Sequence, residues 1–339
     1  MKVLVTGAST PLGTEIIERL LSLPEVTFVI AVAQHARPTR IIESRRLHYR
    51  RVNLTRPRDV HDLLWGEARE RGIQAVIHTA QHRSARDRGP RVHAQNVDAT
   101  RELLAGCADH PTIRRFVQRS FAEVYALHQA TTTLLTEEDP LEFAPVLPQW
   151  LRDRVEADLT ACARFGGQLK IAVLRCAELL APDSGSQLWD YLSSRVCLRP
   201  FGFDPMINVL GLADAADAFI AATRSSLPGV FNIRGGDTLP LSSAIAESGR
   251  LGIPIPGPVM APLYGLRRWA AGFEFRYDLN VRRFHFGGIL DGTRAREAFG
   301  YEPRSSTTWP RPWWRRLFEQ LASGAPVDGV AGPLHGPPS

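Results

Sequence analysis

A short turn near the N-terminus has residue types that could bind a charged group. Residues 2–6 form an apolar run that leads into TGASTPLG, and helical spacing follows at once. The first N–H groups of a helix and the helix dipole together attract phosphate. Gly7 suits the tight turn and Gly13 permits close packing, but Thr10 stands where a third glycine would let backbone approach a pyrophosphate. The turn predicts an anion site, and a plain strand–turn–helix is the alternative.

A second stretch, PQWLRDRVEADL at 148–159, has the spacing of a helix but unusual residues for a reaction centre. Trp150 and Arg154 lie four residues apart, so they share one helix face. An indole N–H only donates, and a guanidinium keeps its charge at neutral pH. Neither residue can therefore act as a general base.

The elements that must position these residues alternate between strand and helix. VTFVIAVA at 26–33 is a continuous apolar run, which is typical of a strand buried on both faces. Strand patterns at 48–54, 74–80, 114–120 and 168–175 alternate with helical patterns. The alternation predicts an α/β fold with a doubly wound parallel sheet.

Composition narrows the classes of protein. The 339 residues carry a net charge of +6, and Lys2 and Lys170 are the only lysines among 41 basic residues. No nucleic-acid-binding motif accompanies this charge, so no nucleic acid is expected as a partner. The four cysteines are widely spaced, which favours reduced thiols over a disulfide framework or a metal site. Without a signal-peptide or membrane-spanning pattern, we expect a cytoplasmic protein.

The order of motifs resembles the extended short-chain dehydrogenases/reductases, in the NAD-dependent epimerase/dehydratase family that includes UDP-galactose 4-epimerase. TGASTPLG is similar to that family's TGxxGxxG, and NVDATRELL at 96–104 to NVxGTxNLL. RRFVQRSFAEVYA at 114–126 resembles the segment that ends in SSxxVYG, and DGTRAREAFGYEPRSST at 291–307 the C-terminal DxSRAxxELGxxPxxS. The resemblance runs collinearly over residues 2–308. It implies a Rossmann-type sheet with a smaller C-terminal substrate lobe.

The resemblance also implies where the reaction centre lies, and three of its residues are replaced. Trp150 stands in place of the catalytic tyrosine of YxxxK, and Arg154 in place of its lysine. Phe121 stands where a serine or threonine would bind the substrate oxygen. Tyr125 is the nearest phenol in sequence and a possible substitute base, although a core role is the better interpretation.

Loss of the Ser-Tyr-Lys set favours a pseudoenzyme that senses a nucleotide or binds a partner. The alternative is an NAD(P)-dependent oxidoreductase or epimerase that acts on a nucleotide sugar or lipid-like alcohol through a non-standard site. No metal is expected in either case, because no cluster of ligand residues has suitable spacing.

NADP, NAD or another nucleotide is the expected ligand if the turn is functional. The place of the acidic residue that binds the ribose falls near Ala33, which has no carboxylate. His35 and Arg37 could contact a 2′-phosphate, which favours NADP, or they belong to an ordinary basic loop. The expected cofactor-binding residues are Gly7, Ser9, Thr10, Leu12, Gly13, His35, Arg37, Asn53, Leu54, Thr79, Ala80 and Arg154.

We expect a Rossmann domain over residues 1–182, a substrate-type lobe over 183–322 with returns to the sheet, and a flexible tail over 323–339. Two segments, 264–286 and 308–321, combine tryptophan with arginine. Such segments can contact a protein partner or an anionic membrane surface, or they pack on the protein's own C-terminal lobe. The resemblance also implies a homodimer.

Overall fold

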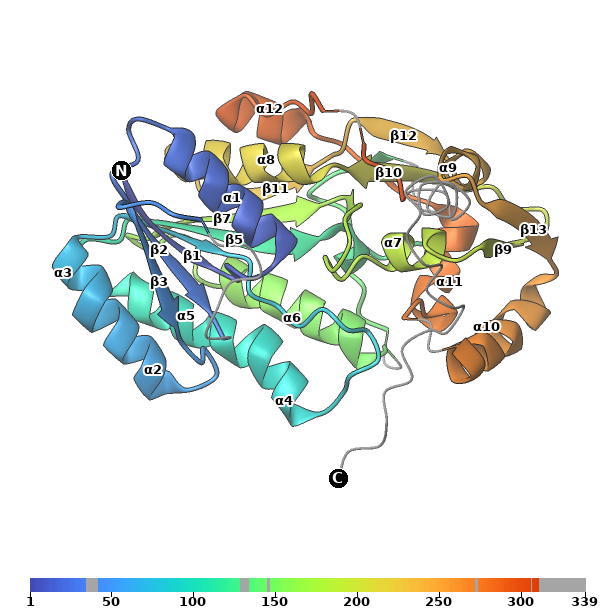
Figure 1. Cartoon of the computed structure of the whole chain (residues 1–339), viewed down its shortest axis with the longest axis horizontal. Helices are drawn as coiled ribbons and strands as arrows, with labels where there is room; N and C mark the ends of the chain where they lie inside the picture. Colours follow the sequence, from blue (N-terminus) through green and yellow to red (C-terminus); the bar gives the residue numbers. More distant parts are fainter. Residues whose placement is uncertain (35–41, 129–133, 145–146, 272–273, 306, 311–339) are drawn as a thin grey trace, which may run out of the picture.

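The computed structural model describes residues 1–34, 42–128, 134–144, 147–271, 274–305 and 307–310 (Figure 1). His35 and Arg37 lie outside these residues, as do most of the 308–321 segment and the whole predicted tail.

A seven-stranded parallel sheet forms the centre of the larger part of the molecule. Its strands are β1 (Lys2–Thr6), β2 (Phe28–Ala33), β3 (Leu47–Arg51), β4 (Ala75–His78), β5 (Arg115–Phe121), β7 (Lys170–Cys176) and β11 (Gly229–Ile233). Their order is β11-β7-β5-β4-β1-β2-β3, so the direction of winding reverses beside β1. A reversal of this kind opens a crevice at the carboxyl ends of the strands. The predicted α/β class and doubly wound parallel sheet are confirmed.

Helices cover both faces of this sheet (Figure 1). One layer holds α1 (Pro11–Ser22), α8 (Leu212–Arg224) and α12 (Thr293–Phe299). The other holds a helical stretch made of α2 (Pro57–His61), η1 (Asp62–Ala68) and α3 (Arg69–Arg71), a second made of α4 (Pro90–His93), η2 (Ala94–Asp98) and α5 (Ala99–Ala108), and α6 (Gln149–Cys162). Two apolar clusters fill the space between sheet and helices, one on each face.

A smaller lobe lies beyond the carboxyl ends of β5 and β7 (Figure 1). Its elements are β8 (Glu178–Leu179), α7 (Gln187–Leu192), β9 (Val196–Pro200), β10 (Met206–Leu210), β12 (Asp237–Pro240), α9 (Leu241–Glu247), β13 (Leu251–Ile255), α10 (Gly257–Ala271) and α11 (Tyr277–Phe286). An aromatic cluster fills its core, where Tyr191 lies 5.1 Å from Phe275 and from Phe284 between ring centroids. The chain returns from this lobe to add β11 to the large sheet.

Short segments connect the two parts. The turn η3 (Ala122–Val124) follows β5 directly, and β6 (Leu134–Leu135) pairs with β14 (Ile289–Leu290). Ion pairs of Glu123 in η3 with Arg154 of α6 and with Arg283 of α11 place both helices close to the carboxyl end of β5.

Candidate nucleotide cleft and reaction centre

The glycine turn has the backbone geometry that its residues predict. Gly7 has a φ of +73°, a conformation that L side chains rarely adopt. A Cβ on Gly13 would lie 2.1 Å from the carbonyl oxygen of Gly7, so only glycine lets α1 pack against the turn. Both glycines are therefore required by the packing of β1, the turn and α1, whether or not a nucleotide binds.

Thr10 caps α1 and uses its hydroxyl within the turn. Its Oγ1 donates to the Gly7 carbonyl at 2.8 Å and accepts from the Gly13 amide at 3.0 Å. The next residue, Pro11, has no N–H group. Two of the positions that could offer a backbone donor to phosphate are thus unavailable, which weakens the anion site that the turn predicts.

A cleft opens beside this turn at the carboxyl ends of β1 and β2. It contains six of the predicted cofactor-binding residues, together with residues of β2 and of the segment that follows β4. These lining residues include Gly7, Ser9, Thr10, Val32, Ala33, Gln34, Asn53, Leu54, Thr55, Ala80, Gln81 and Gln95. Asn53 Oδ1 already accepts from the amide and the hydroxyl of Thr55, so its side-chain NH2 is the group that remains for a ligand.

Four other predicted cofactor-binding residues that the structure describes lie away from the cleft surface. Leu12 and Gly13 are buried in the first turn of α1, and Thr79 is buried with its hydroxyl donated to the Thr6 carbonyl at 2.7 Å. Arg154 is not in this cleft at all. It belongs to the second site, at the end of β5.

Phe121, Trp150 and Arg154 form one stacked unit at that second site. The guanidinium carbon of Arg154 lies 3.7 Å from the ring centroid of Phe121 and 3.9 Å from that of Trp150. A guanidinium between two aromatic rings is stabilised by their negative faces. Phe121, Trp150 and Arg154 are each less than 10% exposed. These three side chains therefore pack against one another.

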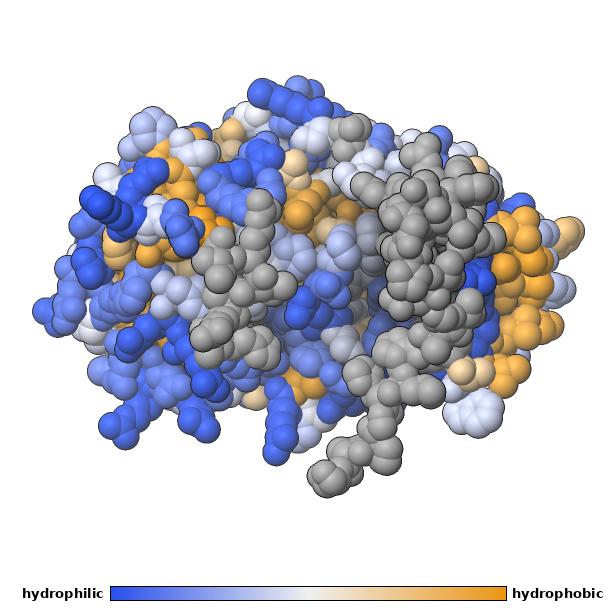
Figure 2. Space-filling view, in the orientation of Figure 1, coloured by the Kyte–Doolittle hydropathy of each residue, from blue (hydrophilic) through white to orange (hydrophobic). Residues whose placement is uncertain are grey.

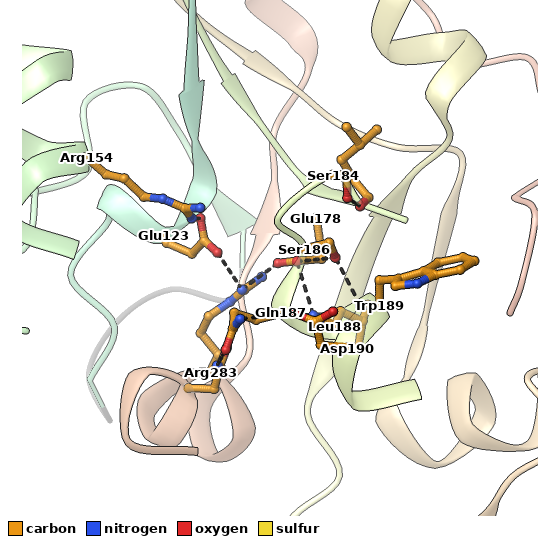
Figure 3. Close-up of polar contacts among 12 residues, drawn as sticks. Glu123, Arg154, Glu178, Ser184, Ser186, Gln187, Leu188, Trp189, Asp190 and Arg283 are labelled. Atoms are coloured by element: carbon orange, nitrogen blue, oxygen red, sulfur yellow. Dashed lines mark hydrogen bonds and ion pairs between the residues drawn. The ribbon is translucent and has the colours of Figure 1, made fainter. Parts of the chain in front are cut away.

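A buried network of charges holds this stack in place (Figure 3). Glu123 of η3 forms ion pairs with Arg154 of α6 and with Arg283 of α11. Arg283 also binds Glu178 of β8, with 2.6 Å between Nη1 and Oε2. Elements far apart in the sequence thus meet through alternating arginine and glutamate side chains.

The environment of Glu178 explains its ionisation. Burial by itself raises the pKa of a carboxyl group, but the charge of Arg283 and the Ser186 hydroxyl, 2.6 Å from Oε1, hold the pKa of Glu178 below its usual value. The nearby carboxylates raise the pKa of Arg283 against the effect of burial. The pair is therefore ionised together.

Arg119 adds a third arginine to the site. It lies two residues before Phe121 on β5, so both side chains point to the same face of the sheet. Its guanidinium carbon is 4.7 Å from the Phe121 ring, and its buried Nε has no hydrogen-bond partner. Burial lowers the pKa of Arg119 to about 10.

These side chains leave little space at the reaction centre. The cavity bounded by Phe121, Arg154, Cys176, Glu178 and Ser186 has a volume of about 10 Å³. That is roughly the space that a single water molecule needs. A larger cavity of about 320 Å³ lies on the other side of Glu123, between the start of α6 and α11, and its wall is mostly apolar.

Tyr125, the candidate substitute base, is 2% exposed. Its hydroxyl donates to Asn232 at 2.6 Å and accepts from Arg175 at 3.1 Å. Burial raises its pKa to about 12. Ser120, next to Phe121, donates to Asp158 at 2.5 Å. Both hydroxyls take part in buried networks.

Sequence reasoning missed Arg119, Glu123, Glu178 and Arg283. Arg119 could have been found from its two-residue spacing to Phe121. The two glutamates and Arg283 have no such signal, because η3, β8 and α11 meet only in the tertiary structure. Among the described residues, no group of three or more histidine, cysteine, aspartate or glutamate side chains is arranged to hold a metal ion.

The chain belongs to the NAD-dependent epimerase/dehydratase family, whose model matches residues 3–197. Uncharacterized proteins of Mycobacterium tuberculosis and Mycobacterium bovis are 30% identical to it over 314 residues. The match covers 90% of this chain and 81% of each of those proteins. The resemblance predicted from the motifs is confirmed.

Solved structures share the fold at low identity. The dTDP-glucose 4,6-dehydratase of Bacillus anthracis, in complex with NAD, has a TM-score of 0.68 at 18% identity, and the match covers 96% of this chain and 98% of that one. The UDP-glucose 4-epimerase of Thermotoga maritima, with UDP-glucose, has a TM-score of 0.66 at 17% identity, and covers 95% and 100%.

Proposed function

We propose that this protein is a non-catalytic member of its family that binds an adenine nucleotide in the cleft beside the glycine turn. In this proposal the nucleotide is a structural or regulatory ligand, and no hydride is transferred. Tyr125 is a core residue in this proposal and does not substitute for the missing base.

One observation carries the non-catalytic part. Phe121, Trp150 and Arg154 form a single buried stack that Glu123 holds by an ion pair. No group in the stack can take a proton from an alcohol, because neither ring has a basic atom and the guanidinium stays charged. General acid–base catalysis typically contributes about 10²–10⁴-fold to a rate. A base, its activating cation and an oxygen donor are all changed together here.

The shape of the two sites supports the choice of ligand. The cleft at β1 and β2 has a volume of about 80 Å³, whereas the cavity at Arg154 has a volume of about 10 Å³. We place an adenosine with its phosphates at the first site, and a nicotinamide ring would need the second. We therefore infer that the adenosine half of NAD or NADP, or a nucleotide such as ADP, contributes the binding energy.

Calorimetric titration of the purified, ligand-free protein with NADH, NADPH, ADP-ribose and ADP tests the proposal. ADP-ribose and NADH should bind with affinities within about threefold of each other, because the nicotinamide adds no contact. Ala80→Leu, which fills part of the cleft, should weaken all four ligands by about tenfold or more. Arg154→Lys is the matched variant at the other site and should leave all four affinities unchanged.

An affinity for NADH about a hundredfold above that for ADP-ribose would contradict the proposal, because the nicotinamide would then be bound. Such a result would favour the alternative, an oxidoreductase or epimerase with a non-standard site. Absence of binding by all four ligands would remove the nucleotide from the proposal and leave only the non-catalytic part.

A further inference from the structure

One helix of the smaller lobe is apolar on two opposite faces. On the inner face of α10, Met260 and Tyr264 are buried in the lobe's aromatic core. On the outer face, Val259, Leu266 and Trp269 are 44%, 58% and 84% exposed. A surface helix normally carries polar residues on its outer face, and a helix that is apolar all round is normally covered on every side. The outer face of α10 is therefore suited to contact with another apolar surface.

The exposed apolar surface continues from α10 onto the neighbouring strands. Leu251 and Ile253 of β13 are 61% and 36% exposed, and the turn after β9 presents Phe201 and Phe203 at 69% and 42%. The Phe201 amide donates to the Ile255 carbonyl at 2.8 Å, which joins this turn to the start of α10. Figure 2 shows apolar residues gathered at the end of the molecule where β9 and β13 lie. We call this surface the apolar end; it consists of Phe201, Phe203, Leu251, Ile253, Val259, Leu266 and Trp269.

Arginines outnumber carboxylates around the apolar end. Residues 193–203 and 248–273, which contribute all seven apolar side chains, contain five arginines and no aspartate or glutamate. Three acidic residues directly flank these ranges. Glu247 is exposed, Asp204 accepts from the amide and hydroxyl of Ser242, and Glu274 contacts Ser84 and Arg86. The border of the apolar end therefore has a net positive charge.

From these observations we propose that the apolar end docks on the surface of an anionic lipid bilayer. Exposed tryptophan, phenylalanine and leucine beside arginine is the combination that lies at the boundary between lipid headgroups and acyl chains. Each arginine near such a surface adds attraction from the negative headgroups. Among the described residues, no helix is long and apolar enough to cross a membrane, so the contact is peripheral.

A second copy of this chain fits the apolar end less well. A two-fold interface places the same patch against itself, so the arginines of one copy would face those of the other. Like charges brought together in this way oppose association. The proposal does not depend on nucleotide binding, because the apolar end lies in the smaller lobe and the cleft lies at β1 and β2.

Sedimentation with vesicles tests this proposal. The full-length protein should sediment with vesicles of phosphatidylcholine and phosphatidylglycerol, and much less with vesicles of phosphatidylcholine alone. Added salt should weaken the binding because it screens the arginines. The double variant Phe201→Ser, Leu266→Ser should reduce binding by about tenfold or more. The matched control is Phe143→Ser, Leu227→Ser, which removes residues that are 64% and 50% exposed elsewhere and should bind as the unchanged protein does.

Three results would overturn the proposal. The first is failure of the unchanged protein to sediment with either kind of vesicle. The second is equal loss of binding in the control and in the patch variant, with both proteins folded by circular dichroism. The third is a homo-oligomer, detected by light scattering, that the patch variant converts to monomers while vesicle binding is unaffected; the apolar end would then be an interface between copies.

Discussion

The cleft beside β1 and the stack at the end of β5 are shaped by different parts of the chain. The cleft has the turn, its two glycines and a volume of about 80 Å³. The end of β5 holds Arg154 stacked on Phe121 and a cavity of about 10 Å³. Backbone geometry therefore dominates at the first site, and side-chain packing dominates at the second.

The physical reason is that the two sites depend on different atoms. Gly7 and Gly13 are needed for β1 and α1 to pack, so their replacement would disturb the fold itself. At the end of β5 the side chains set the shape instead. Buried charges there need partners, and Glu123, Glu178 and Arg283 supply them.

The largest effect is expected from Glu123→Gln. This change leaves Arg154 without its ion pair in a buried site, and breaking a buried pair costs about 3–5 kcal/mol of unfolding free energy. Denaturant unfolding measures the loss. The matched control is Glu138→Gln, since Glu138 is 78% exposed and its pair with Arg294 lies at the surface. A loss of the same size in both variants would mean that the network at the reaction centre has no special role.

A smaller loss, about 1–2 kcal/mol, is expected from Arg154→Lys. A lysine keeps the charge but cannot stack as a flat guanidinium between Phe121 and Trp150. Arg101→Lys is the control, because Arg101 forms exposed pairs with Asp98 and Glu156 and should change stability by less than about 0.5 kcal/mol. Equal stability of Arg154→Lys and the unchanged protein would show that the stack contributes little.

Thr10→Gly tests whether the Thr10 side chain limits nucleotide binding in the cleft. It frees the Gly13 amide and opens the turn, so nucleotide affinity should rise about threefold to tenfold by calorimetry. Glycine is also an acceptable helix N-cap, so the cost in stability should be only a few tenths of a kcal/mol. Thr10→Ala is the control because it frees the same amide but keeps a Cβ, and it should cost about 1 kcal/mol. Unchanged affinity in Thr10→Gly would show that Thr10 does not limit binding.

A pH-dependent effect concerns Asp190 on α7, the helix whose Leu188 amide donates to Glu178. Burial, followed by the charges of Glu274 and Glu178, raises the pKa of Asp190 from 3.8 to about 7. The folded protein therefore holds a proton that the unfolded chain has released, and stability should fall by up to about 4 kcal/mol as the pH rises from about 4 to 7. Unfolding midpoints across this range should flatten in Asp190→Asn. An identical pH profile in both proteins would contradict the assigned cause.

Much of the fold could be predicted from local pattern. The apolar run at 26–33 predicted β2, and the regular alternation of strand and helix predicted the parallel sheet. The glycine turn and the three replaced positions could be placed because they lie at fixed distances from recognisable motifs. Arg283 could not, because nothing in the local sequence of α11 indicates that it reaches Glu123 and Glu178, which lie more than a hundred residues earlier.

The sequence by itself determined the family, the doubly wound sheet and the place of Trp150 and Arg154 on one helix face, since these depend on motif order and periodicity. The tertiary structure decided what surrounds these residues. It stacks Arg154 between two rings, pairs it with Glu123 and directs the Thr10 hydroxyl back into its own turn. These outcomes depend on distances between elements remote in the chain, and only packing sets those distances.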